Sequence, residues 1–82
     1  MADKVVYLID RDAYRKELVE RLTHKDLEEW VAEEDYTGNY TIVKIEANGY
    51  SSVDEALEEE MGYIGNKVSD FEKDYYVITF GF

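Results

Sequence analysis

Hydrophobic and polar positions along the chain follow two periodicities, which predicts a mixture of strands and helices. The first apolar run, Val5 to Ile9, has apolar side chains at odd and even positions alike. A strand with this pattern is buried on both faces, so we predict a central strand. Asp10-Arg11-Asp12 ends it. From Ala13 to Leu22 apolar residues recur at helical spacing, which predicts a first helix.

A second helix is predicted from about His24. Thr23 and Asp26 have the spacing of a capping box, and Leu22 and Leu27 flank them as a hydrophobic staple. We expect this helix to end before the turn-like sequence 36–39. Its inward-facing residues are expected to be Leu27, Trp30, Val31 and part of Glu34.

The following segment predicts a second strand and a third helix. Residues 40–47 alternate between two faces, and Asn48-Gly49 is a turn signal that could close a short hairpin. Ser51 or Ser52 can cap the third helix, which Gly62 ends. The apolar stripe of this helix consists of Val53, Ala56, Leu57 and Met61.

The last part of the chain predicts a loop over residues 63–73 and a strand over residues 75–82. The resulting order, β-α-α-β-α-β, predicts one α+β domain spanning residues 1–82. We expect a sheet of three strands, or four if a hairpin extends at Asn48-Gly49, with helices mainly on one face. If the last strand lies at a sheet edge, it could form the seam of a homodimer.

Composition supports one compact domain with an acidic surface. The chain of 82 residues is 45% hydrophobic and carries a formal charge of −11. Residues 1–25 hold five acids and six bases, a net of +1, whereas residues 26–82 hold fifteen acids and three lysines, a net of −12. Such a field repels nucleic acid and acidic membranes and attracts basic protein surfaces. We therefore expect neither direct nucleic-acid binding nor membrane binding.

The absence of cysteine excludes disulfides and thiolate metal sites, and fits a reducing compartment. The apolar run Val5 to Ile9 is too short for a signal peptide or a membrane span. We expect the protein in the cytoplasm, of a cell or of an infected host.

No catalytic or cofactor motif stands out, and we predict a protein that is not an enzyme and uses no cofactor or metal. His24, the single histidine, is expected at an exposed helix start, where a cation is disfavoured. Asp10 and Asp12 are the best remaining carboxylate pair for an enzyme, yet they equally suit a helix cap. Glu58-Glu59-Glu60 points in three directions and cannot chelate one ion. Gly62-Tyr63-Ile64-Gly65 follows an acidic helix, which does not suit a phosphate clamp.

The acidic helices are the feature that points to function. Carboxylates three and four positions apart on a helix lie about 5–6 Å apart at Cβ, close to the spacing of phosphates. Like charges at this spacing destabilise a helix, so their abundance indicates selection for something besides stability. The candidate protein-binding residues are Asp26, Glu28, Glu29, Glu33, Glu34, Asp35, Asp54, Glu55, Glu58, Glu59, Tyr36 and Tyr63.

The leading hypothesis is a protein-binding module that engages a basic partner surface. In its sharpest form it is a nucleic-acid mimic that inhibits a DNA- or RNA-handling protein. By small size, high negative charge and lack of chemical motifs the chain is similar, as a class, to the antirestriction and anti-CRISPR inhibitors of phages and mobile elements. A structural protein that oligomerises through residues 75–82, with acidic faces that only aid solubility, is the first alternative. An enzyme using a carboxylate pair is the second.

Overall fold

The computed structural model describes residues 3–39, 41–62 and 67–82. It contains a three-stranded antiparallel sheet in the order β2-β1-β3, formed by β1 (Val5–Asp10), β2 (Ile42–Glu46) and β3 (Tyr75–Phe80). The helices are α1 (Lys16–Val19), α2 (His24–Thr37), α3 (Val53–Met61) and α4 (Val68–Phe71). The predicted α+β class and the central position of the first strand are confirmed.

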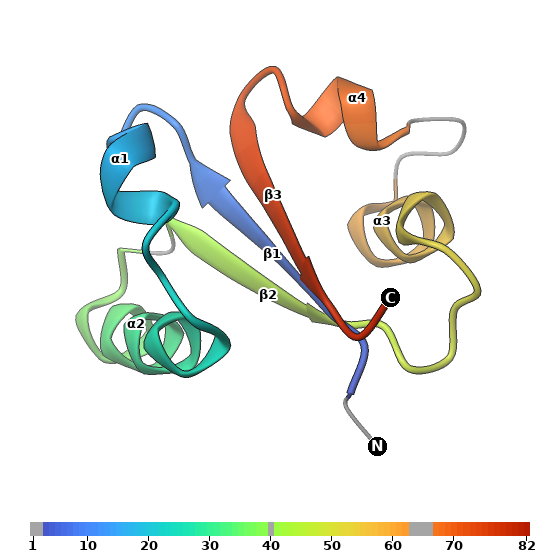
Figure 1. The fold of residues 1–82 in the computed structure, drawn as a ribbon, viewed down its shortest axis with the longest axis horizontal. Helices are drawn as coiled ribbons and strands as arrows, with labels where there is room; N and C mark the ends of the chain where they lie inside the picture. Colours follow the sequence, from blue (N-terminus) through green and yellow to red (C-terminus); the bar gives the residue numbers. More distant parts are fainter. Residues whose placement is uncertain (1–2, 40, 63–66) are drawn as a thin grey trace.

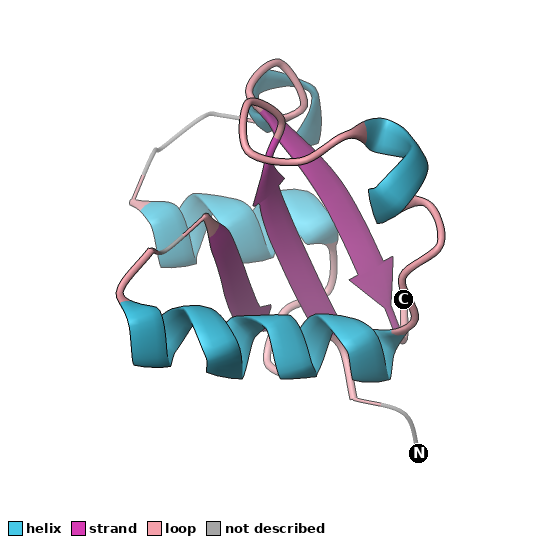
Figure 2. Cartoon of the chain, turned by 90° about the vertical axis from the view of Figure 1, so that its left-hand side faces the viewer, coloured by secondary structure: helices cyan, strands magenta, loops and turns pink. Residues whose placement is uncertain are grey.

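Helices cover both faces of the sheet, which corrects the expectation that they lie mainly on one face (Figure 1). On one face, Val5, Tyr7 and Ile9 pack with Val19 of α1 and Leu27 of α2. On the other face, Val6 and Leu8 pack with residues of α3 and α4. Figure 2 shows the sheet between α2 in front and α3 behind it. The physical reason is the continuous apolar run of β1, because both of its faces must be removed from water.

The first helix is much shorter than its pattern predicts. The side chain of Asp10 accepts a hydrogen bond from the Asp12 N–H group at 2.8 Å, and residues 11–14 form a turn instead of a helix. Arg15 is extended, with φ −78° and ψ 144°, so α1 begins only at Lys16. As a result, Leu18 is 52% exposed although it fits the apolar stripe of a longer helix.

The start of α2 and both ends of α3 agree with their sequence signals, whereas α2 continues through Tyr36 and Thr37, past its predicted end before Tyr36. Thr23 and Asp26 form the predicted capping box of α2, and Ser52 caps α3 by accepting from the Glu55 N–H group at 3.2 Å. Gly38 and Gly62 end the two helices with φ values of 78° and 72°, a left-handed conformation that glycine adopts without strain.

The remaining segments differ from expectation in detail. Asn48 and Gly49 form a turn, but it leads into α3, and no fourth strand is present in the described residues. The predicted loop contains the short helix α4, whose Phe71 is buried against α3. Tyr40, at the start of the predicted second strand, and Tyr63 and Ile64 lie outside the described residues. None of the described helices is both long and apolar enough to cross a membrane.

Candidate functional site

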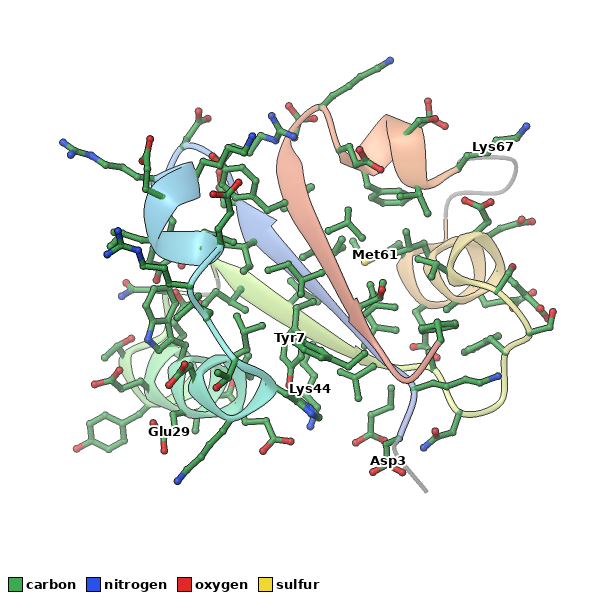
Figure 3. The ribbon with its side chains drawn as sticks, viewed as in Figure 1. Asp3, Tyr7, Glu29, Lys44, Met61 and Lys67 are labelled. Atoms are coloured by element: carbon green, nitrogen blue, oxygen red, sulfur yellow. The ribbon has the colours of Figure 1, made fainter. Side chains whose placement is uncertain are left out.

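The acidic residues of α2 and α3 lie on two separate surfaces. Because α2 and α3 cover opposite faces of the sheet, one flat partner surface cannot contact the outer sides of both helices. Figure 3 shows Glu29 on the side of α2 that faces away from the sheet, and Met61 pointing from α3 toward the sheet. The candidate residues therefore form two separate surfaces, one on α2 and one on α3.

Several of the candidate carboxylates are used inside the fold. Asp26 closes the capping box of α2, and the Thr23 backbone and side chain lower its pKa. Asp54 accepts from the Val68 N–H group at 2.7 Å, which joins α3 to α4. Glu55 accepts from the backbone and hydroxyl of Ser51, and these hydrogen bonds lower its pKa. These three side chains serve as helix caps and connectors.

Glu34 is the candidate for which an exposed role is wrong, because its side chain is 93% removed from solvent. Its carboxylate accepts hydrogen bonds from Tyr14 Oη at 2.6 Å, from the Ile42 N–H group at 2.7 Å and from the Thr41 hydroxyl. Burial on its own raises the pKa of Glu34, but these hydrogen bonds outweigh it and lower the pKa. Glu34 ties α2 to β2 and to the turn before α1, as its expected inward orientation suggests.

Glu28 belongs to a mixed cluster at the start of α2. Its Oε1 atom lies 3.2 Å from His24 Nε2 and 3.8 Å from Lys44 Nζ. His24 is half-buried and stacks on Phe80 at 4.8 Å between ring centroids, so the expected exposed position of His24 is wrong. The surrounding sheet and aromatic rings therefore hold this end of α2 in place.

Tyr7 reaches the same cluster from the central strand. It is fully buried, it contacts Phe80 edge-on at 6.0 Å, and its hydroxyl has no hydrogen-bond partner among the described residues. Burial raises the pKa of Tyr7 to about 12, and the nearby Glu28 charge contributes. The hydroxyl has thus lost its hydration without gaining a protein hydrogen bond.

We expect Tyr7→Phe to raise the free energy of unfolding slightly, by up to about 1 kcal/mol, because it deletes a buried hydroxyl that has no partner. Tyr14→Phe is the matched comparison and should lower it by about 1–2 kcal/mol, since the Tyr14 hydroxyl donates to Glu34. Urea unfolding of both variants measures this difference. Equal losses for the two variants would contradict the described environment of Tyr7.

Five candidate carboxylates have no internal hydrogen bond or ion pair to the described residues: Glu29, Glu33, Asp35, Glu58 and Glu59. The three on α2 are exposed and lie around Tyr36, which is 93% exposed. Glu29 and Tyr36, seven positions apart, lie on the outermost line of the helix, with Glu33 and Asp35 on its two sides. We call Glu29, Glu33, Asp35 and Tyr36 the α2 outer face.

The α3 surface offers less to a partner. Glu58 is half-buried, Glu55 is engaged with Ser51, and Glu60 accepts from Tyr50 Oη at 2.8 Å. Among the exposed large hydrophobic residues of the described chain, none belongs to α3. Among the described residues, this surface is acidic and has no exposed aromatic side chain.

The Asp10–Asp12 pair, which the sequence offered for an enzyme, takes part in a turn. The Asp10 carboxylate accepts a hydrogen bond from the Asp12 N–H group, which stabilises the turn after β1. Among the described residues no group of three or more potential ligands could hold a metal ion.

Two open grooves that the sequence did not suggest lie beside α1. The larger, of about 930 Å³, is lined by residues 11–18 and Tyr76. The smaller, of about 440 Å³, runs along β3. The sequence signal for them is indirect: Leu18 and Leu22 belong to an apolar stripe that the shortened α1 leaves partly uncovered.

Comparison of the chain with known protein families, with curated proteins and with solved structures gave no match.

Proposed function

We propose that this protein is a non-enzymatic binding module whose α2 outer face engages a basic surface of a partner protein. The observation that carries the proposal is Tyr36, 93% exposed among three carboxylates that form no side-chain hydrogen bond or ion pair with the described residues. A tyrosine buries a large, rigid ring at low entropic cost and is enriched in binding hot spots, and a rim of unpaired charge steers a complementary partner. The folded helix presents both before the partner arrives, which limits the ordering cost of binding.

The sharper form of the proposal is that the partner surface normally binds nucleic acid. Glu29 and Glu33 are one helical turn apart, a spacing of about 5–6 Å that is close to that of phosphates. The chain would then act as a mimic that inhibits a DNA- or RNA-handling protein, as antirestriction and anti-CRISPR inhibitors do. In that case nucleic acid and this protein compete for the same surface of the partner.

The α2 outer face can be tested by capture of nucleic-acid-binding proteins on the immobilised chain. The triple variant Glu29→Lys, Glu33→Lys, Tyr36→Ala should weaken capture about 30-fold or more, because a hot-spot side chain contributes about 2 kcal/mol or more. Wild-type capture should fall between low and moderate salt, since the attraction is electrostatic. Circular dichroism of each variant establishes that the fold is kept.

The matched control reverses two carboxylates on the opposite face, Glu58→Lys and Glu59→Lys, which gives the same change in net charge. It should retain the partner. Equal loss with both variants would show nonspecific attraction to the net charge and would refute a defined α2 site, as would the absence of any salt-sensitive partner.

The nucleic-acid mimic has its own test. Duplex or single-stranded nucleic acid added to the captured partner should displace it from the chain. Simultaneous binding of chain and nucleic acid by the partner would refute the mimic while leaving the binding module intact.

A further inference from the structure

The outer edge of β3 has backbone groups that the fold leaves free. The Arg11 N–H group donates to the Asp74 carbonyl at 3.1 Å, and paired positions in an antiparallel ladder alternate between hydrogen-bonded and non-bonded pairs. Tyr76, Ile78 and Phe80 therefore bond to β1, and Val77 and Thr79 direct their N–H and C=O groups away from it. No hydrogen bond from another described segment reaches Val77 or Thr79.

The other edge of the sheet is protected. The Asp10 N–H group donates to Thr41 and the Ala47 N–H group to Lys4, so the outward positions of β2 are Ile42, Lys44 and Glu46. Glu34 accepts from the Ile42 N–H group, and the other two positions carry charged side chains. Charged residues and blocked donors are devices that keep an edge strand from pairing. Residues 75–80, Tyr-Tyr-Val-Ile-Thr-Phe, contain neither charge nor proline.

The surface beside β3 is apolar and locally neutral. The groove along the strand is lined by Val19, Leu22, Ile78 and Phe80, among others. Its charged residues balance, because Arg11 and Lys16 oppose Glu20 and Glu72. The helices α2 and α3 lie over the two faces of the sheet and not along this edge (Figures 1 and 2). Because the charges along this groove balance, its electrostatic potential favours neither a basic nor an acidic partner. A second copy can therefore pack against it without bringing carboxylates close to each other.

We infer that two copies of the chain pair antiparallel through β3, which joins the two sheets into one of six strands about a two-fold axis. A closed two-fold pairing removes the unprotected edge of each copy and leaves only the protected β2 edges exposed. In this dimer the apolar side chains on one face of β3 contact those of the second copy, beside the groove along β3. These side chains are Tyr76, Ile78 and Phe80. Both α2 outer faces stay free, so the inference does not depend on the proposed function.

Sedimentation velocity from low to high micromolar concentration tests the dimer. We expect a reversible monomer–dimer equilibrium that persists or strengthens with salt, since salt screens repulsion between two chains of charge −11. Thr79→Lys, which places a charge on the exposed edge position, should weaken dimerisation at least tenfold, whereas Thr79→Val should not. The α2 outer-face variant should dimerise as before, which separates this test from that of the proposed function.

Residue-resolved amide exchange on the wild-type chain identifies the edge without any variant. The Val77 and Thr79 amides should gain protection as concentration rises, and the Lys44 amide on the opposite edge should not. A monomer at every concentration would overturn the inference and would leave β3 to a strand from a different protein. Protection of Lys44 in place of Val77, or a dimer unaffected by Thr79→Lys, would overturn it as well.

Discussion

Replacing Glu34 with alanine is expected to lower the free energy of unfolding by about 3 kcal/mol. The carboxylate accepts from Tyr14, Thr41 and the Ile42 N–H group in a site that is almost closed to water. Its removal leaves the Ile42 N–H group without an acceptor, and leaves the Tyr14 and Thr41 hydroxyls only each other, at 3.3 Å between their oxygens. An unsatisfied buried donor costs about 1–3 kcal/mol. The stability expected of a domain of this length is about 4–12 kcal/mol, so the variant should be clearly weakened.

Urea unfolding followed by circular dichroism measures this loss. Glu34→Gln should lose less, because the amide oxygen can still accept from the Ile42 N–H group and the amide nitrogen can donate to the Tyr14 or Thr41 hydroxyl. Glu33→Gln is the control on the neighbouring exposed position and should change the free energy by less than about 0.5 kcal/mol. A Glu34→Ala variant as stable as the Glu33→Gln control would mean that the buried network contributes nothing.

The effect of Glu34 should also depend on pH. Its pKa is lowered in the folded protein, so the stabilisation it contributes is fully present above the pKa of an unfolded glutamate. That stabilisation is lost as the pH falls through the lower, folded pKa. The difference between wild type and Glu34→Gln should therefore be constant near neutral pH and shrink below about pH 4. A difference that grows on acidification would contradict the lowered pKa.

Local signals in the sequence were sufficient where one element determines the outcome. The capping box at Thr23 and the glycine stop at Gly62 depend on neighbouring residues only, and the structure has both as predicted. The helix predicted to begin directly after β1 was wrong for the opposite reason, because a distant residue determines the conformation there. Its apolar spacing fits a helix from Ala13, but Tyr14 is held by Glu34, twenty positions along the chain. No periodicity within the segment can report such a contact.

The same distinction applies to the candidate site. The sequence pattern predicts the same binding role for Glu33 and Glu34, although Glu33 is exposed and Glu34 is buried. Their roles depend on which side of α2 contacts the sheet and on which face of the sheet each helix covers. The sequence pattern predicts helices mainly on one face of the sheet, and the division of the acidic residues into two surfaces follows only from the fold.

Because helices cover both faces of the sheet, the protein has two separate layers of buried side chains. Leu27 of α2 and Leu57 of α3 are both fully buried, each against a different face of β1. Leu27→Ala and Leu57→Ala should each lower the free energy of unfolding by about 2–5 kcal/mol, since each deletes three buried carbon atoms and leaves a cavity. Leu18→Ala is the matched control, because Leu18 is half exposed and should lose less than about 1 kcal/mol.

The double variant Leu27→Ala, Leu57→Ala distinguishes two independent layers from one shared core. The two side chains are separated by the sheet, so their losses should add to within about 0.5 kcal/mol. Their sum, about 4–10 kcal/mol, is comparable to the whole stability expected for this chain, and the double variant should be largely unfolded without denaturant. Urea unfolding of the single variants, with circular dichroism of the double variant, provides the measurement. A small loss for either single variant would mean that the corresponding face of the sheet is not covered as described.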